Sequence, residues 1–173
     1  MDVQLIEPNL DYKAAFAIFY NDFWTNDPVN AGFYVDGIRD FDAYVDSLYK
    51  DEQGIDLLDG HVPCSHCWMI DSDGNVLGVI RIRHNIEPQF LREEAGHIGY
   101  DMAPSYRKRG LGTRMLALGL QRATALGLKK VMISADEDNY GSRKIIEANG
   151  GILEAVIQGK VYECPIARYW IDL

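Results

Sequence analysis

The sequence contains few residues of the kinds that mark special classes of protein. Among its 173 residues only three are cysteines, an odd number that is too small for a disulfide scaffold, so we expect reduced thiols. No apolar run approaches the roughly 18 residues that a transmembrane helix needs, so we expect no membrane partner. The first residues carry an acid at Asp2 and lack the cationic stretch of a secretory signal. These absences predict a cytoplasmic protein.

Positive charge is also scarce. Seventeen Lys and Arg stand against 26 Asp and Glu, which gives a formal net charge of −9. A polyanion meets a repulsive average field around such a chain, so we expect no nucleic-acid partner, and any anionic ligand needs a local cationic site. The densest basic run is Arg107, Lys108 and Arg109. No repeat, Gly/Ser linker or low-complexity block divides the chain, and a composition that is 47% hydrophobic predicts one packed domain over residues 1–173.

Periodicity predicts strands and helices in alternation. Alternating or continuous apolar stretches predict strands at 3–6, 66–71, 76–84, 97–102, 130–135, 152–157 and 162–171. Helical spacing of apolar residues predicts helices over 12–23, 41–49, 111–126 and 142–149. Within the strand at 76–84, Ile80 and Ile82 alternate with Arg81 and Arg83, so one face is apolar and the other is charged. The order of these elements predicts an α/β fold, a mixed sheet with helices on both faces.

The most informative stretch joins the strand at 97–102 to the helix at 111–126. A basic turn follows Pro104, and Gly110 and Gly112 alternate where the helix begins. A helix N-terminus carries unpaired N–H groups and about half a positive charge, so this turn predicts a phosphate site. A Walker loop is absent, and Met115 stands where a dinucleotide fingerprint has its third glycine. The alternative is a helix that follows a basic turn, with glycines serving only the bend.

These residues resemble a known family. Arg107-x-x-Gly110-x-Gly112 is similar to the acetyl-CoA motif, Gln/Arg-x-x-Gly-x-Gly/Ala, of the GNAT superfamily of N-acetyltransferases. Asn139-x-x-Ser142, at the start of the next helix, agrees with a second family motif in place and order. The resemblance covers essentially the whole chain and implies the GNAT fold: a central, mostly antiparallel sheet of about seven strands, with the fourth and fifth splayed apart. A further pattern looks like that of a bacterial branch of predicted acetyltransferases: Val62-Pro63, Trp68 and the stretches 81–84, 96–100 and 168–171.

The resemblance implies acetyl-CoA as co-substrate and no metal. Backbone amides from Arg109 to Thr113 would then hold the pyrophosphate of CoA, and the main chain around Met102 would bind the pantetheine arm and polarise the thioester carbonyl. Asn139 and Ser142 would contact the distal pantetheine or the adenosine; the alternative makes Asn139 only a helix cap. The implied cofactor-binding residues are Met102, Arg107, Lys108, Arg109, Gly110, Leu111, Gly112, Thr113, Asn139 and Ser142.

The catalytic residues are less well determined by the resemblance. His97 lies five residues before Met102, where relatives often place a base, and the alternative is a histidine held by structural hydrogen bonds. His84 is a second candidate, and the acids at 93–94 are less well placed. The usual proton-donating tyrosine is missing, because Ile146 stands seven residues after Asn139. Tyr140 is the substitute we consider, although a CoA thiolate can also leave unaided.

Two other clusters have simpler interpretations. His61, Cys64, His66 and Cys67 suggest zinc, but an extended strand places Cys67 on the face opposite Cys64 and His66, and one strand cannot wrap four ligands. The aromatic residues between 16 and 23 are expected in the core, although helices in this region shape the acceptor pocket of this fold.

The sequence thus predicts an acetyl-CoA-dependent N-acetyltransferase. The resemblance implies a primary amine of a small molecule or a peptide as acceptor, and we expect it to attack the thioester directly. The rival interpretation is a non-catalytic CoA-binding sensor or interaction module of the same fold. Relatives often form homodimers through their last strands, and a homodimer is possible here.

Overall fold

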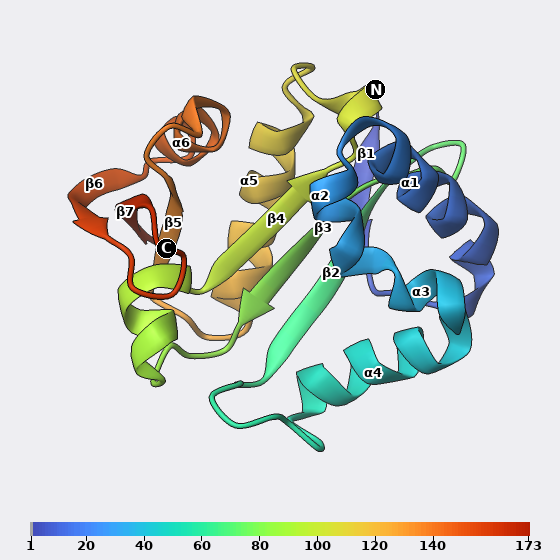
Figure 1. Ribbon diagram of the computed structural model, residues 1–173, viewed down its shortest axis with the longest axis horizontal. Helices are drawn as coiled ribbons and strands as arrows, with labels where there is room; N and C mark the ends of the chain where they lie inside the picture. The colour runs from blue at the N-terminus through green and yellow to red at the C-terminus, as the bar shows by residue number, and fades with distance from the viewer. Residues whose placement is uncertain (1) are drawn as a thin grey trace.

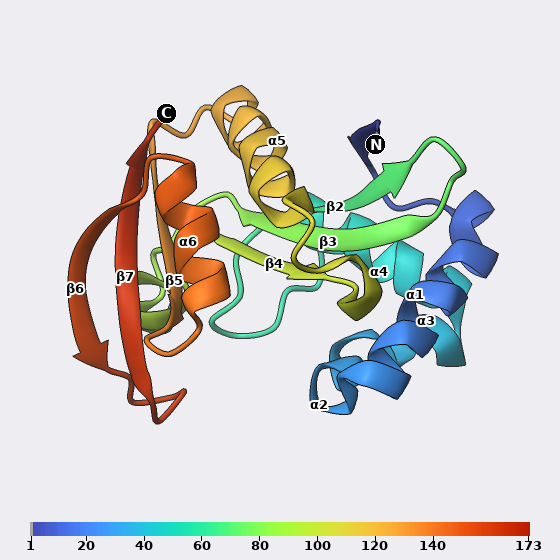
Figure 2. The same ribbon diagram turned by 90° about the horizontal axis from the view of Figure 1, so that it is seen from above.

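The strands of this protein form two hydrogen-bonded sheets. The computed structural model describes residues 2–173. The first sheet is antiparallel, with the strand order β1 (Val3–Ile6), β2 (Cys64–Asp71), β3 (Val76–Arg83) and β4 (Ile98–Met102). The second has the order β5 (Lys130–Asp136), β7 (Pro165–Asp172) and β6 (Ile152–Gln158). Figure 2 shows the second sheet turned across the direction of the first.

Helices cover both faces of the first sheet, as predicted (Figures 1 and 2). Helix α5 lies on one face, α1, α3 and α4 lie toward the other, and α6 packs beside α5 and β5. The α-helices are α1 (Lys13–Asn26), α2 (Pro28–Ala31), α3 (Asp36–Arg39), α4 (Phe41–Gln53), α5 (Leu111–Ala125) and α6 (Tyr140–Ala148). Short turns of other helix types are η1 (Leu10–Tyr12), η2 (Gly32–Tyr34), η3 (Leu91–Ala95) and η4 (Pro104–Tyr106). Within residues 2–173, no helix has the length and apolar character needed to cross a bilayer.

Local side-chain hydrogen bonds explain several of the element boundaries. Asn9 caps η1 by accepting from the N–H of Asp11 at 3.1 Å, and Asp40 caps α4 by accepting from Ala43 at 3.1 Å. The carboxylate of Asp71 accepts from the N–H of Asn75 at 2.9 Å, which closes the predicted hairpin between β2 and β3. Gly127, with φ 89°, follows the end of α5 as expected.

The alternation predicted in β3 divides the interior into two cores. Ile80 and Ile82 are fully buried in the core under α5, and Arg81 and Arg83 lie on the opposite face, where they line a cavity. The second core is aromatic, and Phe16 of α1 lies at its centre. Its ring contacts Phe19, Tyr34, Phe41, Tyr44 and Trp68 at centroid distances between 5.2 and 6.4 Å. The aromatic stripe is therefore core, as expected.

Strands β4 and β5 diverge, which confirms the predicted splaying. They lie beside each other without forming a ladder, and one bridge joins Gly96, just before β4, to Ile133 of β5. The N–H of His97 donates to the carbonyl of Met132 at 2.7 Å next to this bridge. The sheets are therefore closed at the start of β4 and open toward its end, where polar main-chain groups can face a ligand.

The last strand begins later than predicted. Periodicity suggested a strand over 162–171, whereas β7 begins at Pro165. The buried carboxylate of Glu94 accepts from the N–H groups of Lys160 at 2.8 Å and of Val161 and Tyr162 at 3.1 Å each. These donors are consequently held in a loop and do not join the sheet. Burial acts to raise the pKa of Glu94, but the backbone hydrogen bonds outweigh it and keep the pKa below its ordinary value.

Candidate active site

Two cavities meet where β4 and β5 diverge. The first, of about 410 Å³, lies between α2, the end of β4 and the N-termini of α5 and α6, and we call it the α5 cavity. The second, of about 370 Å³, lies between β3, β4, β5 and the loop before β7, and we call it the β3 cavity. Three residues line both: Tyr100, Asn139 and Ser142. Molecules bound in the two cavities would therefore meet at these three side chains.

The N-terminus of α5 opens into the α5 cavity without a side-chain cap. Gly110 occupies the N-cap position with φ 76°, and among residues 2–173 no side chain accepts from the first-turn amides of α5 in its place. A Cβ on Gly110 would meet no atom within 4 Å, so the space above these amides is open. Lys108, with φ 60°, is a second left-handed residue in the turn and lines the same cavity. Free amides beside a helix dipole and a lysine suit an anion such as a diphosphate.

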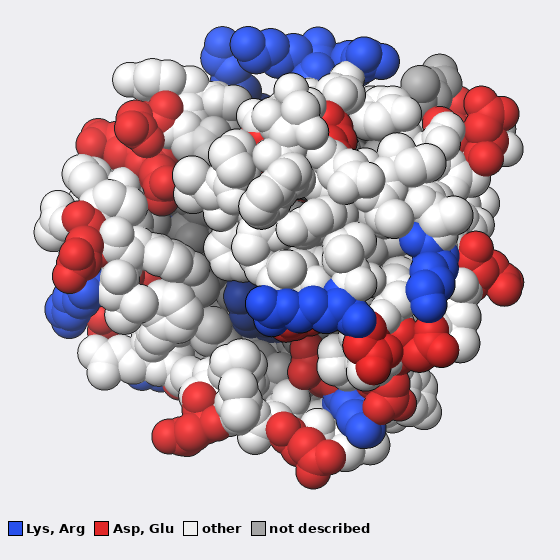
Figure 3. Space-filling view, turned by 45° about the vertical axis from the view of Figure 1, so that its right-hand side comes forward, with Lys and Arg blue, Asp and Glu red and all other residues white. Residues whose placement is uncertain are grey.

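The basic residues before α5 make different contacts. Arg107 is anchored: its Nε donates to the carbonyl of Met102 at 2.9 Å and its Nη2 to Asp27 at 2.7 Å. Arg109 lies over the ring of Tyr106 at 5.4 Å. Figure 3 shows a row of cationic side chains along the top edge of the molecule, where Figure 1 places this loop. Arg107 therefore holds the loop in place, and it lines the α5 cavity together with Lys108 and Gly110.

The main chain of β4 offers polar groups toward β5. Arg83 donates its N–H to the carbonyl of His97 and Ala103 donates to Leu77, so odd-numbered residues bond to β3. Antiparallel pairing alternates, and the N–H groups of Tyr100 and Met102 consequently point to the open side. These groups are available for the pantetheine contact that the resemblance implies around Met102, which stays a prediction.

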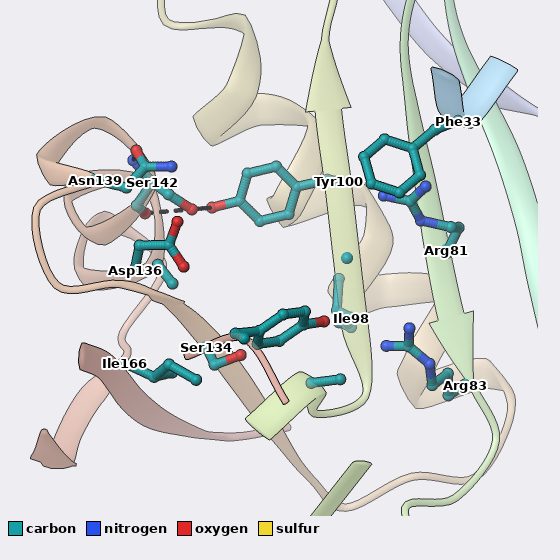
Figure 4. A pocket seen from close by; sticks show the side chains of 14 residues that line it. Phe33, Arg81, Arg83, Ile98, Tyr100, Ser134, Asp136, Asn139, Ser142 and Ile166 are labelled. Carbon is teal, nitrogen blue, oxygen red and sulfur yellow. Dashed lines mark hydrogen bonds between the residues drawn. The ribbon is translucent and has the colours of Figure 1, made fainter. Parts of the chain in front are cut away.

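A hydroxyl pair lies at the junction of the two cavities. The hydroxyl of Tyr100 lies 2.8 Å from Oγ of Ser142 and donates to the carbonyl of Ser142 at 3.2 Å (Figure 4). Burial raises the pKa of Tyr100 to about 12, so this phenol stays protonated at neutral pH. Asn139 caps α6 by accepting from the N–H of Ser142 at 3.0 Å, as the alternative interpretation holds, and it also lines both cavities. Sequence reasoning did not single out Tyr100, although it lies within the informative stretch.

The two catalytic candidates from the sequence lie apart from this junction. His97 is 6% exposed, and its Nδ1 accepts from the N–H of Met132 at 3.0 Å. Burial and the nearby charge of Arg83 lower the pKa of His97, which keeps the ring neutral. Tyr140 is 68% exposed at the start of α6. Neither side chain lines either of the two cavities, and both catalytic roles stay predictions.

Charged residues line opposite walls of the β3 cavity. Figure 4 shows Arg81 and Arg83 on the β3 side and Asp136, at the end of β5, on the α6 side. Arg81 donates to Asp101 at 2.7 Å, and the hydroxyl of Tyr34 donates to the same carboxylate at 2.7 Å. The sequence showed the arginines as one face of a strand, and only the structure shows what they face.

The other proposed bases and the suspected metal ligands lie away from the junction. His84 bonds to Ser65 at 2.8 Å, and Glu93 accepts from Lys160 at 3.3 Å. Strand β2 is extended from Cys64, and His66 bonds to Asp51 at 3.1 Å while Cys67 packs in the core under α5. Over the described part of the chain, no three His, Cys, Asp or Glu side chains are grouped to hold a metal.

Comparison with known proteins gives a family and a set of similar folds. A model described as "Acetyltransferase (GNAT) family" matches residues 18–150. Microcin C7 self immunity acetyltransferase MccE, solved with acetyl-CoA and AMP, is 16% identical with a TM-score of 0.72, over 99% of this chain and 93% of that one. RimJ of Mycobacterium smegmatis, solved with CoA-disulfide, is 18% identical with a TM-score of 0.72, over 98% and 81%. No curated protein matches the sequence.

Proposed function

Since the chain belongs to the acetyltransferase (GNAT) family, we propose that it transfers the acetyl group of acetyl-CoA directly to a primary amine. The observation that carries this proposal is the joining of two cavities at Tyr100, Asn139 and Ser142, one beside uncapped helix amides and one beside charged walls. Acetyl-CoA supplies an activated acyl thioester. A protein that only sensed CoA would have no need of the second cavity, which suits an acceptor.

The residues of the α5 cavity fit CoA. The amides from Arg109 to Thr113 bind the diphosphate, with Lys108 adding positive charge at the same wall. The outward N–H groups of Tyr100 and Met102 bind the pantetheine arm and polarise the thioester carbonyl. Asn139 and Ser142 contact the same ligand from the start of α6.

The acceptor must lose a proton before or during attack. An amine with a pKa of ~10.4 is protonated at neutral pH, and its deprotonation costs roughly 4–5 kcal/mol. We assign the role of general base to Asp136, which would accept the proton directly or through water, because this carboxylate lines the β3 cavity. Nδ1 of His97 already accepts a hydrogen bond from the N–H of Met132.

Two substitutions separate these candidates. Asp136→Asn is expected to lower kcat/KM for an amine by about 10- to 100-fold, because the amide cannot take a proton. His97→Gln, which keeps a hydrogen-bond acceptor, is expected to change it less than about threefold. Steady-state kinetics with saturating acetyl-CoA measure both. The reverse order, together with a changed pH–rate profile in His97→Gln, would return the role to His97.

Tyr100 is the proposed proton donor to the departing thiolate. Tyr100→Phe is expected to lower kcat by about 10- to 100-fold, because the hydroxyl that bonds to Ser142 at the junction is removed. CoA affinity, measured by calorimetry, should change less than about threefold. Tyr140→Phe is the matched control, since it removes a tyrosine hydroxyl from the exposed start of α6. A larger loss in Tyr140→Phe than in Tyr100→Phe would assign the proton to Tyr140.

One experiment tests the proposed function against its rival. A non-catalytic CoA-binding module is favoured by Ile146, a fully buried residue at the position where many relatives have the tyrosine that protonates the thiolate. Thiol release from acetyl-CoA is measured across a panel of small amines and peptides with free N-termini. We expect release with at least one amine. CoA binding without release on any amine would support the sensor.

A further inference from the structure

The two arginines on the cavity face of β3 are not equivalent. Arg81 has a carboxylate partner: it pairs with Asp101 at 2.7 Å, and its guanidinium lies beside Gly99 of β4. Burial acts to lower the pKa of Arg81, but the neighbouring Tyr34 and Asp101 raise it above its ordinary value. The positive charge of Arg81 is therefore neutralised within the protein.

Arg83 lacks such a partner in the described part of the chain. Its Nη1 donates to the carbonyl of Gly96 at 3.0 Å, and no carboxylate of residues 2–173 lies within ion-pair distance of it. Burial and the charge of Arg81 lower the pKa of Arg83. Arg83 is half-buried, and a guanidinium that is partly removed from water beside no counter-charge is unfavourable, so an anion bound next to it relieves that cost. Arg83 lines the β3 cavity, so such an anion would lie in the acceptor's place.

The opposite wall has the opposite charge. Asp136 lines the same cavity from the end of β5, across from Arg83 (Figure 4). Hydroxyls of Ser134 and Tyr162 line the space as well. A cavity of about 370 Å³ suits a small molecule that carries both charges.

We propose that the acceptor is an amine that also carries an oxyanion group, a carboxylate or a phosphonate, paired with Arg83 while its amino group faces Asp136. The proposal rests on the proposed acetyl transfer for what happens to the amine, but not for the binding of the anion. A free amino acid is the simplest molecule of this kind. A polyamine fits poorly, because it would bring a second cation to Arg83.

The test compares matched ligands that differ in the anion alone. Free L-amino acids, β-alanine and 4-aminobutanoate are each compared with the corresponding primary amide, which keeps the amine and removes the negative charge. Binding to the CoA-saturated protein is followed by thermal shift and calorimetry, and turnover by thiol release from acetyl-CoA. For the best amino acid, the matching aminophosphonate decides which oxyanion the site prefers.

Substitutions at Arg83 test whether this residue binds the anion. Arg83→Gln is expected to weaken binding of the best carboxylate by about 10- to 100-fold and of its amide by less than about threefold, since a charge-assisted hydrogen bond is lost only from the carboxylate. Arg83→Lys, which keeps the charge, is expected to restore most of the binding. Arg39→Gln is the matched control, because Arg39 is exposed on α3 and pairs with Asp36 away from both cavities. Unchanged CoA affinity in each variant shows that it is folded.

The outcomes separate this inference from the proposed function. Carboxylate binding that depends on Arg83, without thiol release for any amine, supports the anion site and overturns the transferase. Thiol release that is as fast with amides as with carboxylates overturns the anion site and supports the transferase. No binding of any carboxylate or phosphonate to the CoA-saturated protein also overturns the anion site.

Discussion

Gly110→Glu is expected to weaken CoA binding by more than about 100-fold. The residue lies at the N-cap of α5 with φ 76°, and the space beyond its Cα is open to the α5 cavity. A glutamate there brings a carboxylate to the amides that would bind a diphosphate, and like charges repel at short range. Calorimetry with CoA measures the loss, and enzyme activity should fall with it.

A glycine beyond the other end of α5 provides the control for this substitution. Gly127 has φ 89°, and a Cβ on it would also meet no atom within 4 Å, but it follows the opposite end of the helix. Gly127→Glu therefore carries a similar backbone strain, of about 1–2 kcal/mol, without touching the cavity. We expect lower stability in both variants and lost CoA binding only in Gly110→Glu. CoA binding retained in Gly110→Glu would remove the basis for the diphosphate site.

Phe16→Ala is expected to lower the free energy of unfolding by about 3–5 kcal/mol. The ring is fully buried, and five aromatic rings surround it, so truncation leaves a cavity that rigid neighbours cannot fill. Urea unfolding followed by fluorescence measures the loss. Ile18→Ala, on the exposed side of the same helix at 65% exposure, is expected to change stability by less than about 0.5 kcal/mol.

Phe16→Ala should also affect acceptor binding in the β3 cavity. The ring of Phe16 packs edge-on against Tyr34, whose hydroxyl holds Asp101, the partner of Arg81. Loosening Tyr34 displaces Asp101 and with it Arg81, which lines this cavity. The KM for the acceptor should therefore change more than the KM for acetyl-CoA. A loss of less than about 1 kcal/mol in stability would contradict the central place of Phe16 in the aromatic core.

Patterns that depend on neighbours along the chain were predictable from the sequence. The alternation of Ile80 and Ile82 with Arg81 and Arg83 predicted the two faces of β3, because side-chain direction in a strand has a period of two. The glycines at 110 and 112 predicted an open helix start, because no side chain shields it. The family resemblance added the divergence of β4 and β5, which periodicity alone does not indicate.

Features that depend on what lies opposite in space were not predictable. Arg81 and Arg83 have the same residue type and the same strand face, yet within residues 2–173 only Arg81 has a carboxylate partner. Tyr100 is a candidate because α6 places Oγ of Ser142 2.8 Å from its hydroxyl, and the sequence does not indicate this contact. The short helices α2 and α3 carry too few residues for a periodic pattern.

The bridge at Gly96 has a consequence for catalysis at a distance. Gly96 has φ 68°, and a Cβ there would collide with the carbonyl of Met132, so the two sheets can converge at this vertex only through glycine. A bulkier residue would wedge the strands apart at their closed end and alter the opening angle between them. Tyr100 and Ser142 face each other across that angle farther along β4. In the proposed transfer, the reach of the amine toward the thioester would thus depend on a residue that lines neither cavity.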